Sequence, residues 1–212
     1  MRKKNLYINM KQIIIATSNQ GKIAEFNKMA ANYKIKLTPQ TQKKVDDADE
    51  TGTTFIENAI IKARHAAKIT GMPAIADDSG IEIKHLNQQP GVYSARYIAR
   101  SATSAERCAS ILEKLSSAVT QEARQARFQC VLVYMRSHED ANPIISYGTW
   151  NGYIQQQATG INGHGYDPIF FSPEYNCSAA ELTETQKNSL SHRKIAFEDL
   201  MEQLINKEII SA

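Results

Sequence analysis

The sequence lacks the features of membrane proteins and of disulfide-rich secreted proteins. No apolar run approaches the roughly 20 residues that a membrane-spanning helix needs. The basic N-terminal residues are not followed by the apolar core of a secretory signal. Cysteine is scarce: Cys108, Cys130 and Cys177 are far apart and show no metal-binding or redox spacing. We therefore expect a cytoplasmic protein with reduced thiols and no membrane partner.

The sequence also lacks a strong excess of charge of either sign. The formal net charge is +3 and the basic residues are scattered, whereas proteins that bind duplex nucleic acid concentrate their basic residues on one face. Aromatic residues make up only 8% of the chain, which argues against a stacking surface for single strands. We therefore expect a globular protein with no nucleic-acid partner.

Strand and helix patterns alternate in the first half of the chain, which predicts an α/β fold. The β-branched run Gln12–Ala16 is typical of a first strand, and a helix begins near Lys22. Thr54 and Glu57 form a capping box for a second helix, which Gly71 ends. Further helix caps are predicted at Thr103 and Ser191.

The second half of the chain indicates that the sheet is mixed. The alternating segment Phe128–Tyr134 and the segment Ile144–Trp150 predict a hairpin, so part of the sheet is antiparallel. The 212 residues allow one large domain or two lobes that share a core. We predict an N-terminal extension over residues 1–10, a single two-lobed domain over 11–206 and a tail over 207–212.

Two adjacent carboxylates, Asp77 and Asp78, follow the short apolar run Ala74–Ala76. Charge is costly to bury and is rarely placed beside a buried strand without a partner. If the strand ends there, in Asp-Asp-Ser-Gly, the acidic groups lie at the rim of a sheet and can hold a cation or a water molecule. The alternative is a tight turn, since Asp, Ser and Gly are turn formers.

A polar loop joins the first predicted strand to the helix that follows. Its residues are Thr17, Ser18, Asn19, Gln20, Gly21 and Lys22. Unpaired N–H groups and the positive end of the helix dipole suit an anion at such a junction, and Lys22 adds a full charge. It is not a Walker A loop, because that motif requires other residues at Ala16 and Ile23. The alternative is a helix cap with a surface lysine.

Four acidic residues precede the first capping box: Asp46, Asp47, Asp49 and Glu50. One of them could join Asp77 or Asp78 around Mg²⁺, which prefers oxygen ligands and often bridges one or two carboxylates to a phosphate. The pattern does not choose among the four. The alternative is an ordinary solvated loop.

The segment Gly160–Phe171 combines glycines with a histidine, a tyrosine and an aspartate. Its glycines allow the backbone to approach a flat ligand closely. His164 and Tyr166 offer faces for stacking, and Asp167 offers an acceptor. The alternative is a turn that leads into a strand over Ile169–Phe171.

Three cations lie just before and inside the start of the last predicted helix: Lys187, His192 and Arg193. Cations at a helix N-terminus oppose the helix dipole. A local rule broken in this way points mildly to function, and the alternative is an irregular first turn of a surface helix.

Six segments together resemble the inosine/xanthosine triphosphate pyrophosphatase family, and they occur in the family's order over nearly the whole chain. They are Thr17–Lys22, Glu50–Ala59, Ala76–Ile81, Pro90–Tyr97, Gly165–Phe170 and Ser191–Arg193. One departure concerns the position before the Gly-Tyr-Asp segment, where the family usually has a phenylalanine that stacks on the purine. This chain has His164, and we hypothesise that base affinity is weaker and depends on pH.

The resemblance implies an enzyme that hydrolyses ITP, dITP and XTP to the monophosphate and pyrophosphate with Mg²⁺. It also implies a homodimer and an elongated two-lobed fold around a long mixed sheet flanked by helices. Thr17 to Lys22 would bind the phosphates, Glu50 and Asp78 would hold the metal, and Asp78 would also deprotonate the attacking water. The remaining implied substrate residues are Ser79, His164, Gly165, Tyr166, Asp167, Lys187, His192 and Arg193. A non-catalytic purine nucleotide-binding protein on the same fold is the alternative.

Overall fold

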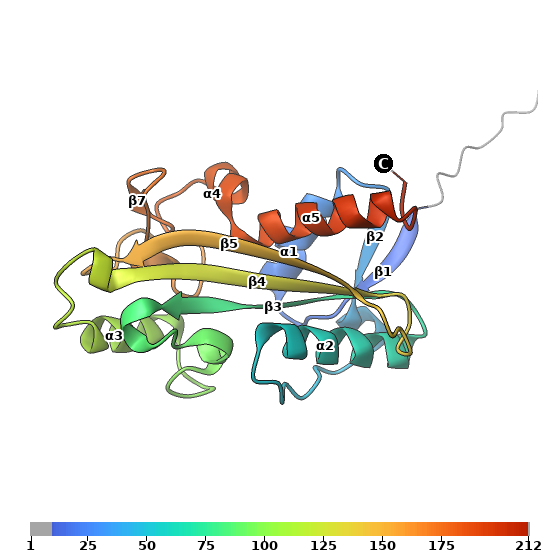
Figure 1. The fold of residues 1–212 in the computed structure, drawn as a ribbon, viewed down its shortest axis with the longest axis horizontal. Coiled ribbons are helices and arrows are strands. Elements are labelled where there is room, and N and C mark those ends of the chain that lie inside the picture. Colours follow the sequence, from blue (N-terminus) through green and yellow to red (C-terminus); the bar gives the residue numbers. More distant parts are fainter. Residues whose placement is uncertain (1–9, 212) are drawn as a thin grey trace, which may run out of the picture. The chain divides into compact units, whose positions relative to one another are not determined.

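The computed structural model describes residues 10–211 and shows an α/β fold with a mixed seven-stranded sheet. The order of the strands is β2-β1-β3-β4-β5-β6-β7 (Figure 1). The fold class predicted from the sequence is thereby confirmed. Most of the predicted extension, residues 1–9, lies outside the described residues.

The chain divides into two compact units. The first comprises the chain up to Asp77 together with Leu132–Ser146 and the segment from Phe197, and the second comprises Asp78–Val131 and Tyr147–Ala196. The division falls within three strands: β3 (Ala74–Ile83), β4 (Gln125–Met135) and β5 (Ile144–Ile154).

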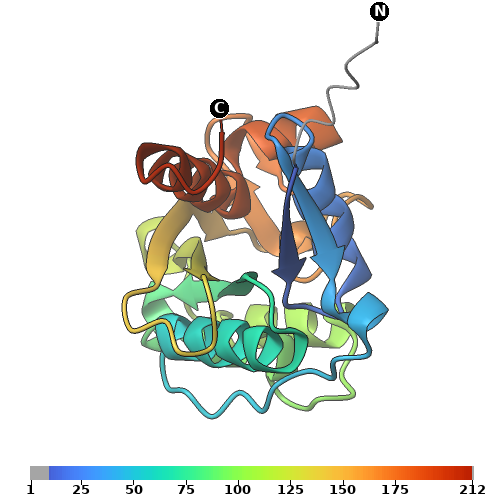
Figure 2. The same ribbon diagram turned by 90° about the vertical axis from the view of Figure 1, so that its right-hand side faces the viewer.

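The first unit contains two parallel strand pairs. Strand β1 (Lys11–Ile15) pairs with β2 (Ile35–Pro39) on one side and with β3 on the other, both in parallel. Figure 2 shows β1 and β2 side by side. The isoleucine run Ile13–Ile15 is almost completely buried, as expected for an inner strand.

Helices of the first unit cover its strands with small or aromatic residues. Helix α1 (Gln20–Ala30) packs Phe26 against Phe197, with the ring centroids 5.9 Å apart. Helix α2 (Phe55–Thr70) has the predicted capping box at Thr54 and Glu57 and ends at Gly71 in a left-handed conformation. No helix within residues 10–211 is both long and apolar enough to cross a membrane.

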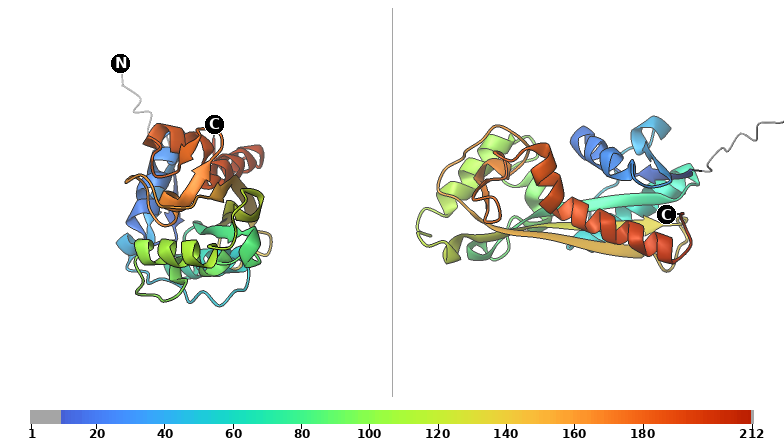
Figure 3. Two further views of the ribbon diagram at one scale, coloured as in Figure 1. Left: turned by 90° about the vertical axis from the view of Figure 1, so that its left-hand side faces the viewer. Right: turned by 90° about the horizontal axis from the view of Figure 1, so that it is seen from above.

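The core of the second unit lies between its strands and helix α3 (Ser104–Lys114), which lie side by side in Figure 3. Helix α3 begins with the capping box predicted at Thr103. Phe128 packs against Phe170 at a centroid distance of 4.6 Å, and Trp150 lies against both rings. Strands β6 (Phe170–Ser172) and β7 (Cys177–Ser178) extend the sheet with antiparallel pairings.

The last two helices are consecutive, and only one of them was predicted. Helix α4 (Glu184–Leu190) begins with a capping box at Thr183, and helix α5 (His192–Asn206) follows directly. Ser191 Oγ accepts a hydrogen bond from the Lys194 N–H at 3.2 Å, which confirms Ser191 as the cap of the last helix. Short 3-10 helices are found at Gln40–Lys43, Lys84–Leu86, Gly91–Arg96, Glu122–Arg124 and Asp167–Ile169.

The structure corrects both sequence-based readings of Asp77 and Asp78. Neither a strand end nor a tight turn is found, because β3 continues to Ile83 and both aspartates lie in its middle. The strand continues because Ile81 and Ile83 are fully buried in the core of the second unit. In addition, the Ile81 N–H donates to Ser94 Oγ at 2.9 Å. Both carboxylates are therefore carried by one continuous strand.

Candidate active site

The loop between β1 and α1 is ordered by its own polar side chains. Asn19 caps the helix, and its Oδ1 accepts a hydrogen bond from the Lys22 N–H at 3.1 Å. Thr17 Oγ1 accepts from the Asn19 N–H at 3.2 Å. Ser18, Asn19, Gln20 and Gly21 are exposed. The predicted anion-binding loop thus presents a helix N-terminus to solvent, with no acidic residue in the first helical turn.

Lys22 and Asp77 form an ion pair within the first unit. Lys22 Nζ lies 3.1 Å from Asp77 Oδ1, and the Asp77 side chain is fully buried. An unpaired carboxylate in that position would be strongly unfavourable, so Lys22 offsets its charge. The pair also ties the β1–α1 loop to the strand that carries Asp78.

The acidic loop separates into residues with different contacts. Asp47 accepts hydrogen bonds from Ser18 Oγ at 2.6 Å and from Gln40 Nε2 at 2.6 Å, so it supports the β1–α1 loop. Glu50 Oε1 lies 3.0 Å from Lys62 Nζ on α2. The carboxylate of Glu50 is thereby held at the start of the segment that leads into the capping box.

In the second unit, Ser79 and Arg193 are in direct contact. Arg193 Nη2 donates to Ser79 Oγ at 3.1 Å, so the start of α5 reaches the residue next to Asp78. Arg193 and Asp78 are both 6% exposed. A guanidinium and a carboxylate are thus both mostly buried around adjacent positions of β3.

His192 lies on the face of Phe128. The two rings are stacked, with centroids 5.0 Å apart and planes 11° apart, and His192 is buried. Gly148 of β5 allows the backbone of His192 to approach that strand closely, because a Cβ at position 148 would lie 1.9 Å from the His192 carbonyl oxygen. The first residue of α5 is therefore fixed in orientation before any ligand binds.

Asp167 organises the glycine-rich loop. Its Oδ2 accepts from the His164 N–H at 2.7 Å and forms an ion pair with Lys187 of α4. Gly163 leaves room for this carboxylate, since a Cβ at Gly163 would lie 2.2 Å from Asp167 Oδ2. Three residues that the sequence placed at the site are therefore in contact within the second unit: His164, Asp167 and Lys187.

Tyr166 does not offer a stacking face, contrary to the sequence-based expectation. It is 4% exposed, and its hydroxyl donates to the Ser94 carbonyl oxygen at 2.8 Å. Burial also raises its pKa. Cys108 supports the same loop, donating from Sγ to the Gly165 carbonyl oxygen at 3.4 Å, and burial raises the pKa of this thiol to about 11. His164, by contrast, is exposed.

The carboxylates of Glu50 and Asp78 are of the type that binds a hard divalent cation. Mg²⁺ takes carboxylate and phosphate oxygens and keeps several waters, so it does not need a complete protein cage. Within residues 10–211, no group of three or more His, Cys, Asp or Glu side chains is arranged to hold a metal by itself. The donor chemistry therefore fits a cation shared between one or two carboxylates and a phosphate-bearing ligand.

Sequence reasoning missed several supporting residues. Phe128 was assigned only to a strand, although it stacks on His192. Ser94 joins β3 to Tyr166 through both its side chain and its carbonyl oxygen. The segment Pro90–Tyr97 was one of the six resembling segments, so a signal was present in the sequence, but the pattern gave no role for it.

Comparisons with known proteins agree with one another. A family model described as the Ham1 family matches residues 13–203. A dITP/XTP pyrophosphatase of Shewanella oneidensis is 49% identical, covering 95% of this chain and 98% of that protein. A dITP/XTP pyrophosphatase of Photorhabdus laumondii is 47% identical, covering 93% of this chain and 100% of that protein. A solved structure of a HAM1 protein from Coxiella burnetii has a TM-score of 0.87 at 48% identity, covering 93% of this chain and 100% of that one.

Proposed function

Because the chain belongs to the Ham1 family, we propose that it is a pyrophosphatase that hydrolyses non-standard purine nucleoside triphosphates, namely ITP, dITP and XTP. The products are the nucleoside monophosphate and pyrophosphate. Relatives about half identical over nearly their full length are named dITP/XTP pyrophosphatase. The observation that carries the proposal lies on β3: Asp78 stands between Asp77, which pairs with Lys22, and Ser79, which binds Arg193.

The phosphates are bound by cations and N–H groups in this proposal. A nucleoside triphosphate carries about four negative charges, and phosphoryl transfer depends mainly on positioning and charge stabilisation. Thr17 to Lys22 offer a helix N-terminus and an ammonium group. Lys187 contributes a second ammonium group, held in place by Asp167. No nucleophilic serine or cysteine is required.

Asp78 is the proposed general base. Its carboxylate accepts a proton from the water that attacks phosphorus, while the bond between the α- and β-phosphates breaks and pyrophosphate leaves. Glu50 and Asp78 would hold Mg²⁺, which when bound offsets phosphate charge and makes the water more acidic. Asp78 lies within strand β3, so its backbone has a defined extended conformation from which the carboxylate is presented.

Base selection is proposed to come from donors at the start of α5. Hypoxanthine presents an acceptor at its 6-position, where adenine presents an amino donor. Arg193 and a protonated His192 would pair with the former and leave the latter unsatisfied. Such a mismatch in a polar pocket can change rates by about 10⁴. The stacking of His192 on Phe128 keeps this arrangement in place.

Replacing Arg193 with methionine should lower the selectivity for ITP. We expect kcat/KM for ITP to fall about 10²-fold more than that for ATP. The 6-oxo group loses a donor, whereas the lost hydrogen bond to Ser79 affects both nucleotides alike. Steady-state kinetics on both nucleotides measures this ratio. The control is Arg100→Met, since Arg100 is exposed. An unchanged ratio of ITP to ATP activity in Arg193→Met would contradict the assignment.

Replacing His164 with phenylalanine should tighten base binding and remove its pH dependence. An imidazole is a smaller stacking surface than a phenyl ring, and histidine is the side chain suited to changing its charge near neutral pH. We therefore expect the wild-type KM for ITP to vary between about pH 6 and pH 8, and the variant KM to be lower and flat. Equal KM values for both proteins across that range would rule out this role of His164.

The remaining features of the proposal concern assembly and location. We propose a homodimer that acts in the cytoplasm and uses Mg²⁺ as its cofactor, as the family resemblance implies. Initial rates on ITP, XTP, dITP, GTP and ATP with Mg²⁺ test the function. Preference for the first three supports it, whereas binding without turnover would favour a non-catalytic nucleotide-binding protein.

A further inference from the structure

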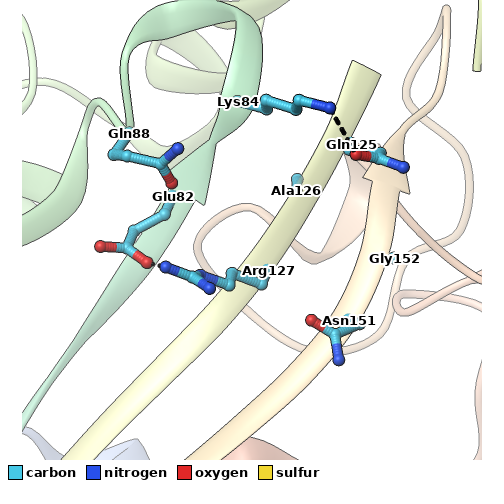
Figure 4. Close-up of a pocket in the computed structure, with 8 residues that line it drawn as sticks. All are labelled: Glu82, Lys84, Gln88, Gln125, Ala126, Arg127, Asn151 and Gly152. Carbon is cyan, nitrogen blue, oxygen red and sulfur yellow. Dashed lines mark hydrogen bonds and ion pairs between the residues drawn. The ribbon is translucent and has the colours of Figure 1, made fainter. Parts of the chain in front are cut away.

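The second unit contains a polar pocket of about 360 Å³. Figure 4 shows its lining, which comes from β3 and the turn after it, from β4 and from β5: Glu82, Lys84, Gln88, Gln125, Ala126, Arg127, Asn151 and Gly152. None of these residues belongs to the proposed active site. The pocket residues Glu82 and Arg127 alternate with core residues such as Ile81 and Phe128. Since neighbouring residues of a strand point to opposite faces, the side chains of Glu82 and Arg127 lie on the face opposite the core.

Arg127 offers an unused pair of donors in this pocket. Its Nε donates to Glu82 Oε2 at 2.7 Å, and its two terminal nitrogens have no hydrogen-bond partner among the described residues. Glu82 Oε2 also accepts from Gln129 Nε2 at 3.1 Å. The Glu82 carboxylate thus orients the Arg127 guanidinium through Nε. The two terminal nitrogens, Nη1 and Nη2, remain available to donate to a ligand. This fork of two nitrogens matches the spacing of oxygens in a phosphate or carboxylate.

Further donors lie around Arg127, and cations outnumber anions. Lys84 Nζ contacts Gln125 Oε1 at 3.3 Å and keeps only an exposed ion pair with Glu122. The side chains of Gln88 and Asn151 have no hydrogen-bond partner within residues 10–211. Two cations and one carboxylate line the pocket, and Glu122, the exposed partner of Lys84, is not among the lining residues. The charge of the lining itself therefore favours an anion.

The backbone at the edge of the pocket is held in an unfavourable conformation. Asn87 and Gln88 have φ values of 52° and 66°. Residues other than glycine adopt this left-handed region of backbone conformation only at a cost. The Gln88 N–H donates to the Ile83 carbonyl oxygen at 3.1 Å, which fixes the turn. Strained residues of this kind concentrate at binding sites, where the surrounding structure enforces them. Here the strain places the Gln88 amide at the pocket.

We propose that this pocket is a binding site for a small phosphate anion, with the terminal nitrogens of Arg127 as its bidentate anchor. Lys84 supplies the second positive charge, and the amides of Gln88 and Asn151 donate to the remaining oxygens. Inorganic phosphate and pyrophosphate share this chemistry. Binding of pyrophosphate would be binding of a reaction product, and only this part rests on the proposed function.

Nuclear magnetic resonance on the full-length protein tests the site directly. Sodium phosphate and sodium pyrophosphate are titrated separately while the Arg127 Nε–H signal and the Asn151 side-chain amide signals are followed. We expect both to shift and saturate at or below about 10 mM, where weak specific anion sites fill. Saturation by pyrophosphate alone identifies the product as the ligand, and equal saturation by both identifies a general phosphate site. Either result supports the proposal and is read without any hydrolysis.

Two variants and one control make the test specific. Arg127→Gln should weaken anion binding at least tenfold, as should Asn151→Asp, which adds a carboxylate without removing a hydrogen bond to protein. For Arg127→Gln the Asn151 amide reports binding, and for Asn151→Asp the Arg127 signal does. Arg100→Gln changes the net charge equally outside the pocket and should bind as wild type. The proposal would be overturned if the signals did not shift, or if Arg100→Gln lost as much anion affinity as Arg127→Gln. It would also be overturned if the shifts depended on the concentration of protein rather than of anion. The last result would indicate an interface between two copies of this chain.

Discussion

Replacing Asp78 with asparagine is expected to reduce kcat for ITP hydrolysis by about 10³-fold or more. The substitution keeps the size and shape of the side chain and removes only its negative charge and its basicity. Because Asp78 is the proposed general base and metal ligand, both roles are lost together. Single-turnover rates, with enzyme in saturating excess over ITP and with Mg²⁺ present, measure the effect on the hydrolytic step without interference from product release.

The control for this prediction is Asp199→Asn, because Asp199 is exposed on α5 and bonds to Gln203 of the same helix. It should retain wild-type turnover. Circular dichroism and thermal melting of Asp78→Asn should show a folded protein, because β3 is held by its backbone and by the core residues Ile81 and Ile83. A folded Asp78→Asn variant with more than about a tenth of wild-type activity would refute the assignment, since a general base contributes 10²-fold or more.

Replacing Arg124 with methionine should produce a large loss of stability, although Arg124 is a charged residue. Arg124 is 6% exposed, and within residues 10–211 its side-chain hydrogen bonds all go to backbone carbonyl oxygens. Its Nε and Nη2 donate to Ile154 and Gln155 at 2.7 Å each, and its Nη1 donates to Leu115 at 2.8 Å and Ala118 at 3.0 Å. These carbonyls belong to the segment just after α3 and to the last residue of β5 and the residue that follows it.

The expected cost of Arg124→Met is about 3–5 kcal/mol in the free energy of unfolding. Several buried carbonyl oxygens lose their only charged donor, and each unsatisfied group costs about 1–3 kcal/mol before relaxation. Burial also lowers the pKa of this guanidinium, as desolvation disfavours its charged form. Urea titration and calorimetry should show a midpoint roughly 10 °C lower, because about 1 kcal/mol shifts Tm by 2–4 °C in a chain of this size.

Arg127→Met is the matched control, since Arg127 lies only three residues further along, on β4, but is half-exposed and paired with Glu82. Exposed ion pairs contribute about 0–1 kcal/mol, so its unfolding curve should nearly overlay that of the wild type. Similar losses of unfolding free energy in the two variants would show that the four hydrogen bonds from Arg124 to carbonyl oxygens stabilise the protein no more than an exposed ion pair does.

The sequence predicted the local elements well because their signals are local. The capping boxes at Thr54 and Thr103 lie where their residue spacing placed them. The glycine at position 71 ends α2 for the reason that its freedom at positive φ implies. The Ile13–Ile15 run is an inner strand because it is β-branched and apolar.

Features that depend on long-range packing could not be predicted from local pattern. Asp77 and Asp78 resemble a turn, yet β3 continues because Ile81 and Ile83 enter a core built from distant segments. The partner of Asp77 is Lys22, 55 residues away, and that of Ser79 is Arg193, 114 residues away. Tyr166 was expected at a ligand, but a distant carbonyl of Ser94 holds it in the core.

The products formed from ITP test the central claim most directly. A ³¹P nuclear magnetic resonance time course of wild-type protein with ITP and Mg²⁺ distinguishes every phosphate species. The account predicts that the signals of IMP and pyrophosphate grow in equal amounts from the first time point, and that Asp78→Asn produces neither. Release of inorganic phosphate with accumulation of IDP would contradict it, because cleavage would then lie between the β- and γ-phosphates.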